Sequence, residues 1–456
     1  MFCLGKILRG LGAMVVLAGC CAWGQSSATL LLEEPYGKLG FFTATGHAAV
    51  YLSGVCAETP LMLRTCAPGE LGAVISRYDG VGSYDWVAIP LIPYLYAVEQ
   101  PDDVPLFADA KMVNFLRDQY RRKHLESVAP DKGNGQTPGG NWYELVGTAY
   151  DRATYAFEIE TTSVQDEAFI RAYNAAPNRS HFRTVSSNCA DFARNVINFY
   201  FPRALHRSVV ADVGIATPKQ MAKTLLKYSA RHPELEFSRF VIPQIPGSIA
   251  RSTPVHGVVE SFFKSKKYIV PSVVVSPIFA GCVAAVYVGT GAGHFDPARH
   301  ALVYNAERDL ERPLGAEDRR AFQSELNHLQ ADPARDSTKA EKWARLFRNS
   351  APDFDAEGRP VLRIETGDEV VSVGVASSNI NIMDNGAGDR LIQELLEARL
   401  HAELRRGGSP KVSESDVERD WNLLEKSRGN PEAEASMRRL QTAGLNERAE
   451  RAGNRP

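Results

Sequence analysis

The sequence has no excess of charge of either sign. Its 456 residues carry 52 lysines and arginines against 54 aspartates and glutamates, a formal net charge of −2. Proteins that bind nucleic acid usually carry a basic face, so this balance argues against such a partner. Cysteine is also scarce, at seven residues, which excludes a small disulfide-scaffold protein. With 44% hydrophobic and 23% charged residues, the composition is that of a globular chain.

Motifs for metals and dinucleotides are missing as well. His294 and His300, with Asp296 between them, lack the spacing of a recognisable ligand set. The glycines of 289–293 alternate too closely for a phosphate-binding turn and precede no strand–helix unit. The sequence therefore predicts no cofactor and no metal, and it shows no internal repeat.

Residues 1–24 have the pattern of an export signal. Lys6 and Arg9 precede a short apolar run that is too short to span a bilayer. The stretch Leu17-Ala18-Gly19-Cys20 resembles a bacterial lipobox, in which the cysteine is lipidated and becomes the mature N-terminus. Ordinary cleavage after Gly24 is the alternative. Both interpretations export the chain to the cell envelope, and the lipobox anchors it on the periplasmic or outer side.

Export makes disulfide chemistry available to the remaining cysteines. Cys56 and Cys66 flank an expected hairpin loop that contains Pro60. In an oxidising compartment they can pair, and so short a loop gains about 2–3 kcal/mol from the bond. Cys189 and Cys282 have no evident partner, so each is a candidate reactive thiol.

Residues 28–235 mix strand and helix patterns, which predicts an α+β domain. Strands are expected at 29–32, 47–52, 72–78, 86–92 and 154–161. Helices are expected at 109–122, 165–174, 189–200 and 218–228. A loop rich in glycine and proline, 130–140, is expected to be a surface insertion or a lid over a site.

Residues 236–300 form an expected connector that contains a long apolar stretch, 268–293. About 20 apolar residues suffice to span a bilayer. However, Lys264, Lys266 and Lys267 stand just before the stretch and would place that end in the cytoplasm, against the exported N-terminus. A spanning helix, favoured on length, a membrane-surface segment and a buried core element therefore all stay open.

Residues 301–456 are charged and mainly helical by pattern. They are expected to hold a strand pair at 361–365 and 369–375, helices at 389–406 and after the capping box of Ser415 and Glu418, and a disordered tail after Ser427. The helices are either solvated or bind a protein partner.

Two segments carry candidate chemistry. His47 opens the strand 47–52, and Asn188 can cap a helix whose first turn holds Cys189. The N-terminal end of a helix favours a thiolate, and its unpaired N–H groups can hold an oxyanion. A histidine at a neighbouring strand edge would serve as general base and acid. The alternative is structural, with the thiol a small core residue and the histidine a strand residue.

The order of these two motifs resembles the circularly permuted NlpC/P60 papain-like superfamily, in its lecithin-retinol acyltransferase-like branch. Asn188-Cys189-Ala190-Asp191-Phe192 is similar to the Asn-Cys-Glu-His-Phe motif of that branch, and 46–52 is similar to its His-x-x-Ile-Tyr-Leu strand. The resemblance covers 30–200 at most. It implies a papain-like core, an antiparallel sheet packed on helices, in which Cys189 is the nucleophile and His47 the base.

The resemblance also implies a third polar residue on the next strand, which fixes the imidazole. Ser76 is our candidate for this role and Asp79 its rival, whereas an ordinary strand serine is the alternative. For an exported bacterial protein the resemblance implies hydrolysis of amides in cell-wall peptides. The permuted branch makes a lipid-directed thiol acyltransferase or esterase the alternative. A third hypothesis is a non-catalytic, lipid-anchored binding module that holds a protein partner through 301–456.

Overall fold

The computed structural model describes residues 26–36, 45–106, 108–179, 182–245, 247, 249–289, 295–304, 316–317, 320, 324, 327, 349–366 and 369–376. The expected export signal with Cys20 lies outside the described residues, as do the helices expected at 389–406 and after Ser415.

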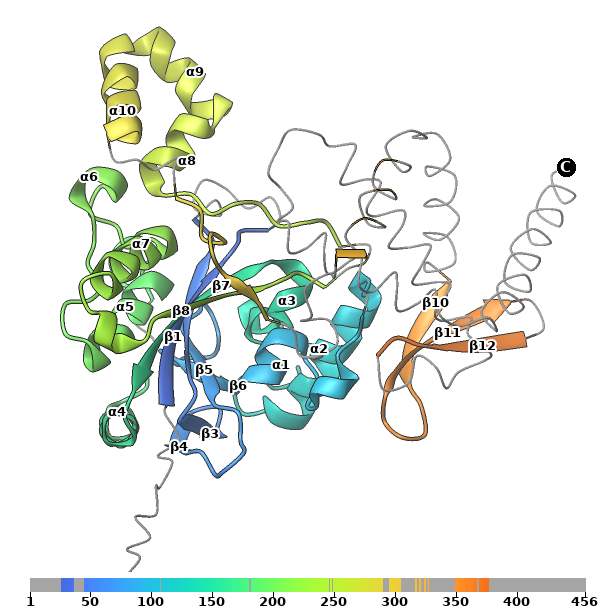
Figure 1. The fold of residues 1–456 in the computed structure, drawn as a ribbon. Helices are drawn as coiled ribbons and strands as arrows, with labels where there is room; N and C mark the ends of the chain where they lie inside the picture. The colour runs from blue at the N-terminus through green and yellow to red at the C-terminus, as the bar shows by residue number, and fades with distance from the viewer. Residues whose placement is uncertain are drawn as a thin grey trace, which may run out of the picture.

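A seven-stranded sheet forms the centre of the molecule, in the order β6-β5-β2-β1-β7-β8-β9 (Figure 1). The strands are β1 (Ser26–Glu33), β2 (His47–Leu52), β5 (Ala73–Ser76), β6 (Val87–Pro90), β7 (Thr154–Thr161), β8 (Ser238–Ile242) and β9 (Leu302–Val303). All neighbours pair antiparallel except β8 and β9, which are parallel. The predicted α+β class is confirmed, and the antiparallel sheet packs on helices as expected.

Helices cover both faces of this sheet (Figure 1). One face carries α1 (Leu91–Tyr96), α2 (Ala110–His124) and α3 (Thr148–Asp151), and the other carries α4 (Ser163–Ala175), α5 (Cys189–Tyr200) and α7 (Pro218–Ser229). Strand β1 shows why two layers form. Leu31 enters the core on the α1–α3 side, whereas Leu30 and Leu32 enter the opposite core. Successive side chains of a strand point to opposite faces, so a continuous apolar run needs cover on both.

The main sheet continues past residue 235, where the expected domain boundary falls. Strand β8 pairs with β7 over five residues, and β9 then adds to the edge of β8. Part of the expected connector 236–300 is therefore an integral part of the sheet.

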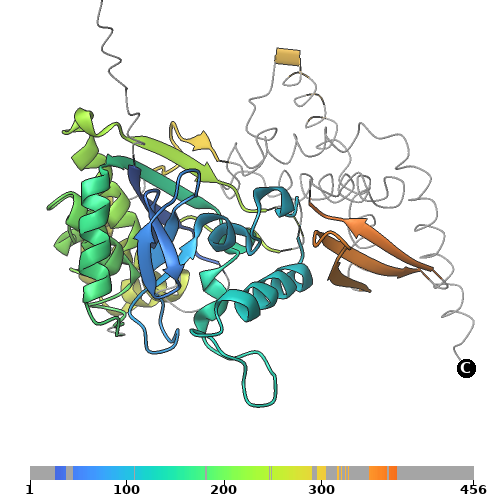
Figure 2. The same ribbon diagram turned by 90° about the horizontal axis from the view of Figure 1, so that it is seen from below.

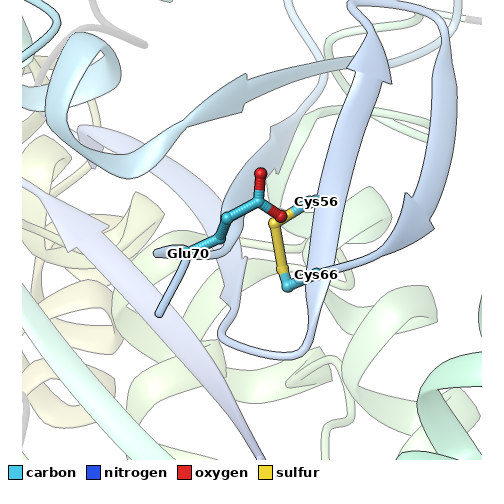
Figure 3. A group of neighbouring side chains, drawn as sticks. All are labelled: Cys56, Cys66 and Glu70. Atoms are coloured by element: carbon cyan, nitrogen blue, oxygen red, sulfur yellow. A yellow bond between two sulfur atoms is a disulfide. The ribbon is translucent and has the colours of Figure 1, made fainter. Parts of the chain in front are cut away.

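A small hairpin of two strands lies beside β6, formed by β3 (Val55–Thr59) and β4 (Met62–Thr65). A disulfide joins Cys56 to Cys66 across it (Figure 3), so the pairing that the sequence left open is formed. Glu70 lies beside the bridge and accepts hydrogen bonds from the Arg64 guanidinium at 2.6 and 2.8 Å. Arg64 thereby lowers the pKa of Glu70 to about 2. Because the sulfurs are bonded to each other and the carboxylate is paired, this cluster holds the loop in place and offers no set of metal ligands.

Three helices project from one end of the sheet, α8 (Val258–Lys264), α9 (Lys266–Val275) and α10 (Pro277–Gly289). The single spanning helix that the length of 268–293 favoured is not formed. The helix breaks at Ser276, because proline at 277 disfavours a helical conformation in the residue before it. Among the helices of the described residues, none combines the length and the apolar character needed to cross a membrane.

A second sheet of three strands lies beside α2 (Figure 2), formed by β10 (Ser350–Phe354), β11 (Pro360–Thr366) and β12 (Glu369–Gly374). The predicted strand pair 361–365 and 369–375 is confirmed as β11 and β12, whereas β10 was not predicted. Leu362 and Ile364 join the core on the α1–α3 side. The Leu106 N–H also donates to the carbonyl of Val375 at 2.8 Å, which ties the small sheet to the main domain.

Candidate active site

Cys189 is the first residue of α5, and its neighbours explain why the helix begins there. The side chain of Asn188 accepts a hydrogen bond from the Asp191 N–H at 3.0 Å, which confirms Asn188 as the N-cap. The amide of Asn188 also donates to the carbonyls of Thr184 and Ala216, each at 3.0 Å. These bonds fasten the start of the helix to two loops, so the position of Cys189 is fixed from three sides.

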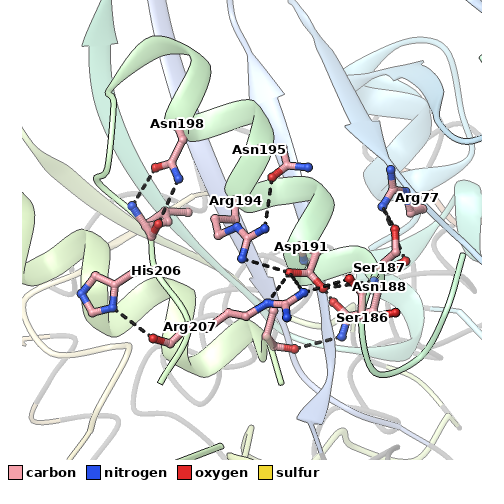
Figure 4. A network of polar contacts seen from close by, with 12 residues as sticks. Arg77, Ser186, Ser187, Asn188, Asp191, Arg194, Asn195, Asn198, His206 and Arg207 are labelled. Carbon is pink, nitrogen blue, oxygen red and sulfur yellow. Dashed lines mark hydrogen bonds and ion pairs between the residues drawn. The ribbon is translucent and has the colours of Figure 1, made fainter. Parts of the chain in front are cut away.

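Asp191 stands where the motif of the permuted branch has histidine, and it has a structural role here (Figure 4). Its carboxylate is buried and accepts two hydrogen bonds from Arg207, at 2.9 and 2.7 Å. Arg194 forms a further ion pair with it at 3.3 Å. A buried carboxylate needs such partners. Asp191 therefore links the first turn of α5 to the loop after the helix and does not line the cavity.

Arg77, directly after β5, joins the same helix start to the sheet. Its guanidinium donates to the Ser187 hydroxyl at 2.9 Å, forms an ion pair with Asp85 and lies 4.9 Å from the centre of the Phe192 ring. Figure 4 shows Arg77 and Ser187 beside the capping network of Asn188 and Asp191. The end of β5 and the start of α5 are thus held together by a buried cation.

His47 opens β2, and the glycine before it sets the direction of the chain. Gly46 has φ of +71°, and a Cβ at this position would lie 2.1 Å from the carbonyl oxygen of Glu33, so only glycine fits. The imidazole is buried and stacks on the ring of Tyr78, with centroids 4.1 Å apart. Burial lowers the pKa of His47 well below 6.5, and the nearby Arg152 cation lowers it further. The imidazole is therefore neutral at pH 7 and able to accept a proton.

The structure brings Cys189 and His47 to one cavity of about 550 Å³. The backbone amide groups of Ala48, the residue after His47, and of Ala190 favour the thiolate of Cys189 and so act to lower its pKa. Burial nevertheless raises the pKa of Cys189 to about 11, because desolvation outweighs these two amide groups. The helix start alone was expected to favour a thiolate. The site instead holds a neutral thiol and a neutral imidazole at rest.

The structure does not place the Ser76 hydroxyl against the imidazole. Ser76 ends β5 and shares the sheet face of His47, but it does not line the cavity. Its Oγ is buried and has no hydrogen-bond partner among the described residues. The rival candidate, Asp79, is exposed and does line the cavity. The Nε2 atom of His47 also lacks a hydrogen-bond partner in the described part of the chain, so the Tyr78 ring is what orients the imidazole.

A buried network of charges adjoins His47, and sequence reasoning missed it. Arg152 is 3% exposed, lies 3.3 Å from Glu33 Oε2 and donates to Glu144 at 2.7 Å. Glu33 is opposite His47 in the pairing of β1 with β2, and it accepts a hydrogen bond from the Tyr94 hydroxyl. Burial raises the pKa of Glu33, and Arg152 opposes that shift. The sequence signal was Glu33, an acidic residue that directly follows the three leucines of β1.

The cavity walls combine aromatic rings with charges of both signs. The rings belong to Tyr36, Tyr78, Tyr143 and Phe182, and the charges to Arg77, Asp79, Glu144 and Arg152. Asn141, Tyr143 and Glu144 follow the glycine- and proline-rich loop directly, so the end of this loop forms part of the wall. Such a lining suits a ligand that carries both apolar and charged groups.

In comparisons with known proteins, no family model, no curated protein and no solved structure matches the chain. The function of this chain is therefore inferred from the geometry of this cavity.

Proposed function

We propose that the protein is an exported cysteine hydrolase of the cell envelope that cleaves amide bonds in cell-wall peptides. Cys189 acts as the nucleophile and His47 as general base and acid. The observation that carries the proposal is the shared cavity, which is lined both by Cys189 at the start of α5 and by His47 at the start of β2. The resemblance of both motifs to the permuted NlpC/P60 superfamily supports the same assignment, and the predicted lipid on Cys20 would anchor the enzyme at a membrane.

The reaction follows from the resting charges of the two groups. His47 takes the proton of the thiol as the sulfur attacks the amide carbon and the carbonyl oxygen becomes an oxyanion. The N–H of Cys189 has no partner within its helix and can stabilise that oxyanion. The imidazolium, made more acidic by burial and by Arg152, gives its proton to the leaving nitrogen as the C–N bond breaks. Water, deprotonated by His47, then hydrolyses the thioester and restores the thiol.

The lining supports a peptide substrate. Cell-wall peptides are short and carry carboxylates and amino groups, which cations and carboxylates of a cavity wall can bind. Arg77 provides a cation at the end nearest α5, whereas Asp79 and Glu144 provide acidic groups. Tyr143 offers a ring against which the aliphatic part of such a peptide packs.

One observation favours a second candidate, a lipid-directed thiol acyltransferase or esterase. Val258 at the start of α8 lines the cavity, and α8 leads directly into the apolar helices α9 and α10. In this version the thioester chemistry is the same, but the acyl group comes from a lipid.

The test incubates the protein with soluble peptide fragments of digested cell wall and, separately, with a diacyl phospholipid, and follows the products by mass spectrometry. We expect the protein to cleave amide bonds of the peptides. Cys189→Ala and His47→Gln should each abolish this cleavage, whereas the matched thiol control, Cys282→Ala, should retain it. An activated ester, p-nitrophenyl acetate, should add an acetyl mass to Cys189 as a thioester. Acyl transfer from the phospholipid alone would favour the second candidate. No adduct, together with a large loss of thermal stability in Cys189→Ser, would contradict both and support a binding module.

A further inference from the structure

Large apolar side chains gather on α6 (Val209–Asp212), α9 and α10, at one end of the molecule (Figure 1). These helices, together with Val213 directly after α6, hold more than half of the large apolar side chains that the described residues expose. The set comprises Val209, Val210, Val213, Val270, Val273, Val274, Val275, Ile278, Phe279 and Val288. Helix α6 contacts α8 and α10, so the two groups adjoin. We call these residues the apolar tip.

The apolar tip lacks the polar face of an ordinary surface helix. Val275 is 84% exposed and Ile278 is 83% exposed, and these two residues stand on either side of the break between α9 and α10. Helix α10 contains no charged residue, and in α9 the charges are confined to Lys266 and Lys267 at its start. A helix that is apolar all round belongs in a core or in lipid. Because these apolar helices are exposed, we expect an apolar medium to cover this surface.

The charges beside the tip identify that medium. Lys266 and Lys267 are exposed at the base of α9, and residues 266–289 contain no acidic side chain. Lysines next to an apolar insert are the pattern of binding to anionic lipid headgroups. A protein partner would instead be met by a polar rim around the apolar centre. The cation bias therefore favours a bilayer with negative surface charge.

The lengths of the two helices limit the depth of insertion. With 10 and 13 residues, α9 and α10 extend about 15 and 20 Å at 1.5 Å per residue, less than the ~30 Å hydrocarbon core of a bilayer. We propose that the apolar tip inserts into one leaflet of an anionic phospholipid bilayer, with Lys266 and Lys267 at the headgroups. Because Val258 lines the cavity and opens α8, the helix next to the tip, insertion holds the cavity close to the membrane. The inference stands whether or not the proposed hydrolase activity does.

The first experiment measures co-sedimentation of the chain beginning at Gln25, which carries no lipid, with vesicles. One set contains equal parts of phosphatidylglycerol and phosphatidylcholine, and the other phosphatidylcholine alone. We expect binding to the anionic vesicles, weakened at least about ten-fold by Val274→Asp with Val275→Asp. Lys266→Ser and Lys267→Ser should each weaken it about five-fold. Val164→Asp, at another exposed valine, on α4, is the control and should leave binding unchanged.

The second experiment reports insertion directly. Cys56 and Cys66 are bonded to each other, so Cys189→Ala leaves Cys282, which is exposed on α10, as the free thiol of the chain beginning at Gln25. A nitrobenzoxadiazole label there should shift to the blue on anionic vesicles. Circular dichroism verifies that each variant folds.

Several results would overturn the inference. If neither the valine variants nor the lysine variants change vesicle binding, the inference is wrong. It is also wrong if the emission of the label on Cys282 does not shift on anionic vesicles. A third result is a chain that fails to bind vesicles and forms a dimer in sedimentation velocity that Val274→Asp with Val275→Asp abolishes. That result would assign the apolar tip to self-association.

Discussion

The imidazole of His47 stacks on the phenol ring of Tyr78, with centroids 4.1 Å apart and ring planes inclined by only 8°. Tyr78 is itself anchored, because its hydroxyl lies 3.3 Å from that of Tyr94, which donates in turn to Glu33. The candidate base is thus oriented by an aromatic ring at the end of a buried hydrogen-bond chain. This arrangement replaces the polar side chain that the sequence resemblance led us to expect.

Replacing Tyr78 should separate ring stacking from hydrogen bonding. Tyr78→Leu removes the ring that orients His47, and we expect kcat for peptide cleavage to fall about ten-fold or more, in line with the stacking energy and the geometric demands of proton transfer. Tyr78→Phe keeps the ring and should retain most of the activity. If the two variants lose activity equally, the hydroxyl chain to Glu33 matters rather than the stack. Steady-state kinetics with melting temperatures for both variants distinguish these results.

The pH dependence of Cys189 alkylation should show that the Cys189 thiol and the His47 imidazole are both neutral at rest. Because burial raises the pKa of this thiol to about 11, its alkylation by iodoacetamide in Cys282→Ala protein should keep rising with pH well above 8. Peptide cleavage should behave differently, since it needs neutral His47, whose pKa lies below 6.5. We expect kcat/KM to stay level from pH 7 to 6.5 and to decline only at lower pH. An alkylation rate that is already at a plateau at pH 6 would indicate a preformed thiolate and contradict the neutral pair.

The disulfide between Cys56 and Cys66 should support stability without affecting chemistry. Cys56→Ala with Cys66→Ala removes a short covalent loop, and we expect the free energy of unfolding to fall by about 2–3 kcal/mol. Cleavage should be unchanged, because β3 and β4 do not line the cavity. Glu70→Gln, which weakens the exposed pair with Arg64 and the hydrogen bond from the Ala67 N–H, should leave the urea midpoint close to that of the parent protein. Urea titration of the three proteins under oxidising conditions measures these differences. If the cysteine double variant has the same midpoint as the parent protein, the disulfide does not stabilise the fold.

Elements with strong local signals were predictable from the sequence. Helix α5 spans Cys189–Tyr200, as expected from the Asn188 cap and the apolar stripe that follows. The run 86–92 was expected to be one strand, but the chain leaves β6 at Pro90 and starts α1 at Leu91. A short apolar run fits a buried strand and a buried helix equally well, so periodicity could not divide it. Within 268–293 length favoured one helix, whereas Pro277 weakened it, and the break at Ser276 directly precedes that proline.

The site was predictable only where a residue type carries its own chemistry. Cys189 and His47 each begin an element, and both were found from local patterns. Tyr78 was missed, because its contact with His47 depends on how β5 aligns with β2 in the folded sheet. Arg152 was missed for the same reason, since its partner Glu33 belongs to a strand far away in the sequence. Strand register is set by tertiary packing, which one sequence does not display.

Arg152 should govern both the stability of the site and the acidity of His47. Arg152→Met leaves Glu33 buried without its cation, and we expect a loss of about 3–5 kcal/mol in the free energy of unfolding. Adding Glu33→Gln should recover much of that loss, because the unpaired charge is removed with it. The Arg152 cation lowers the pKa of His47, so its removal should raise that pKa and move the acid limb of kcat/KM to higher pH in the double variant. Arg122→Met, at an exposed pair with Asp118, should leave the urea midpoint nearly unchanged and the acid limb in place. Urea titration and pH–rate profiles of the four proteins measure both effects. An acid limb that stays fixed in the double variant would show that burial alone sets the pKa of His47.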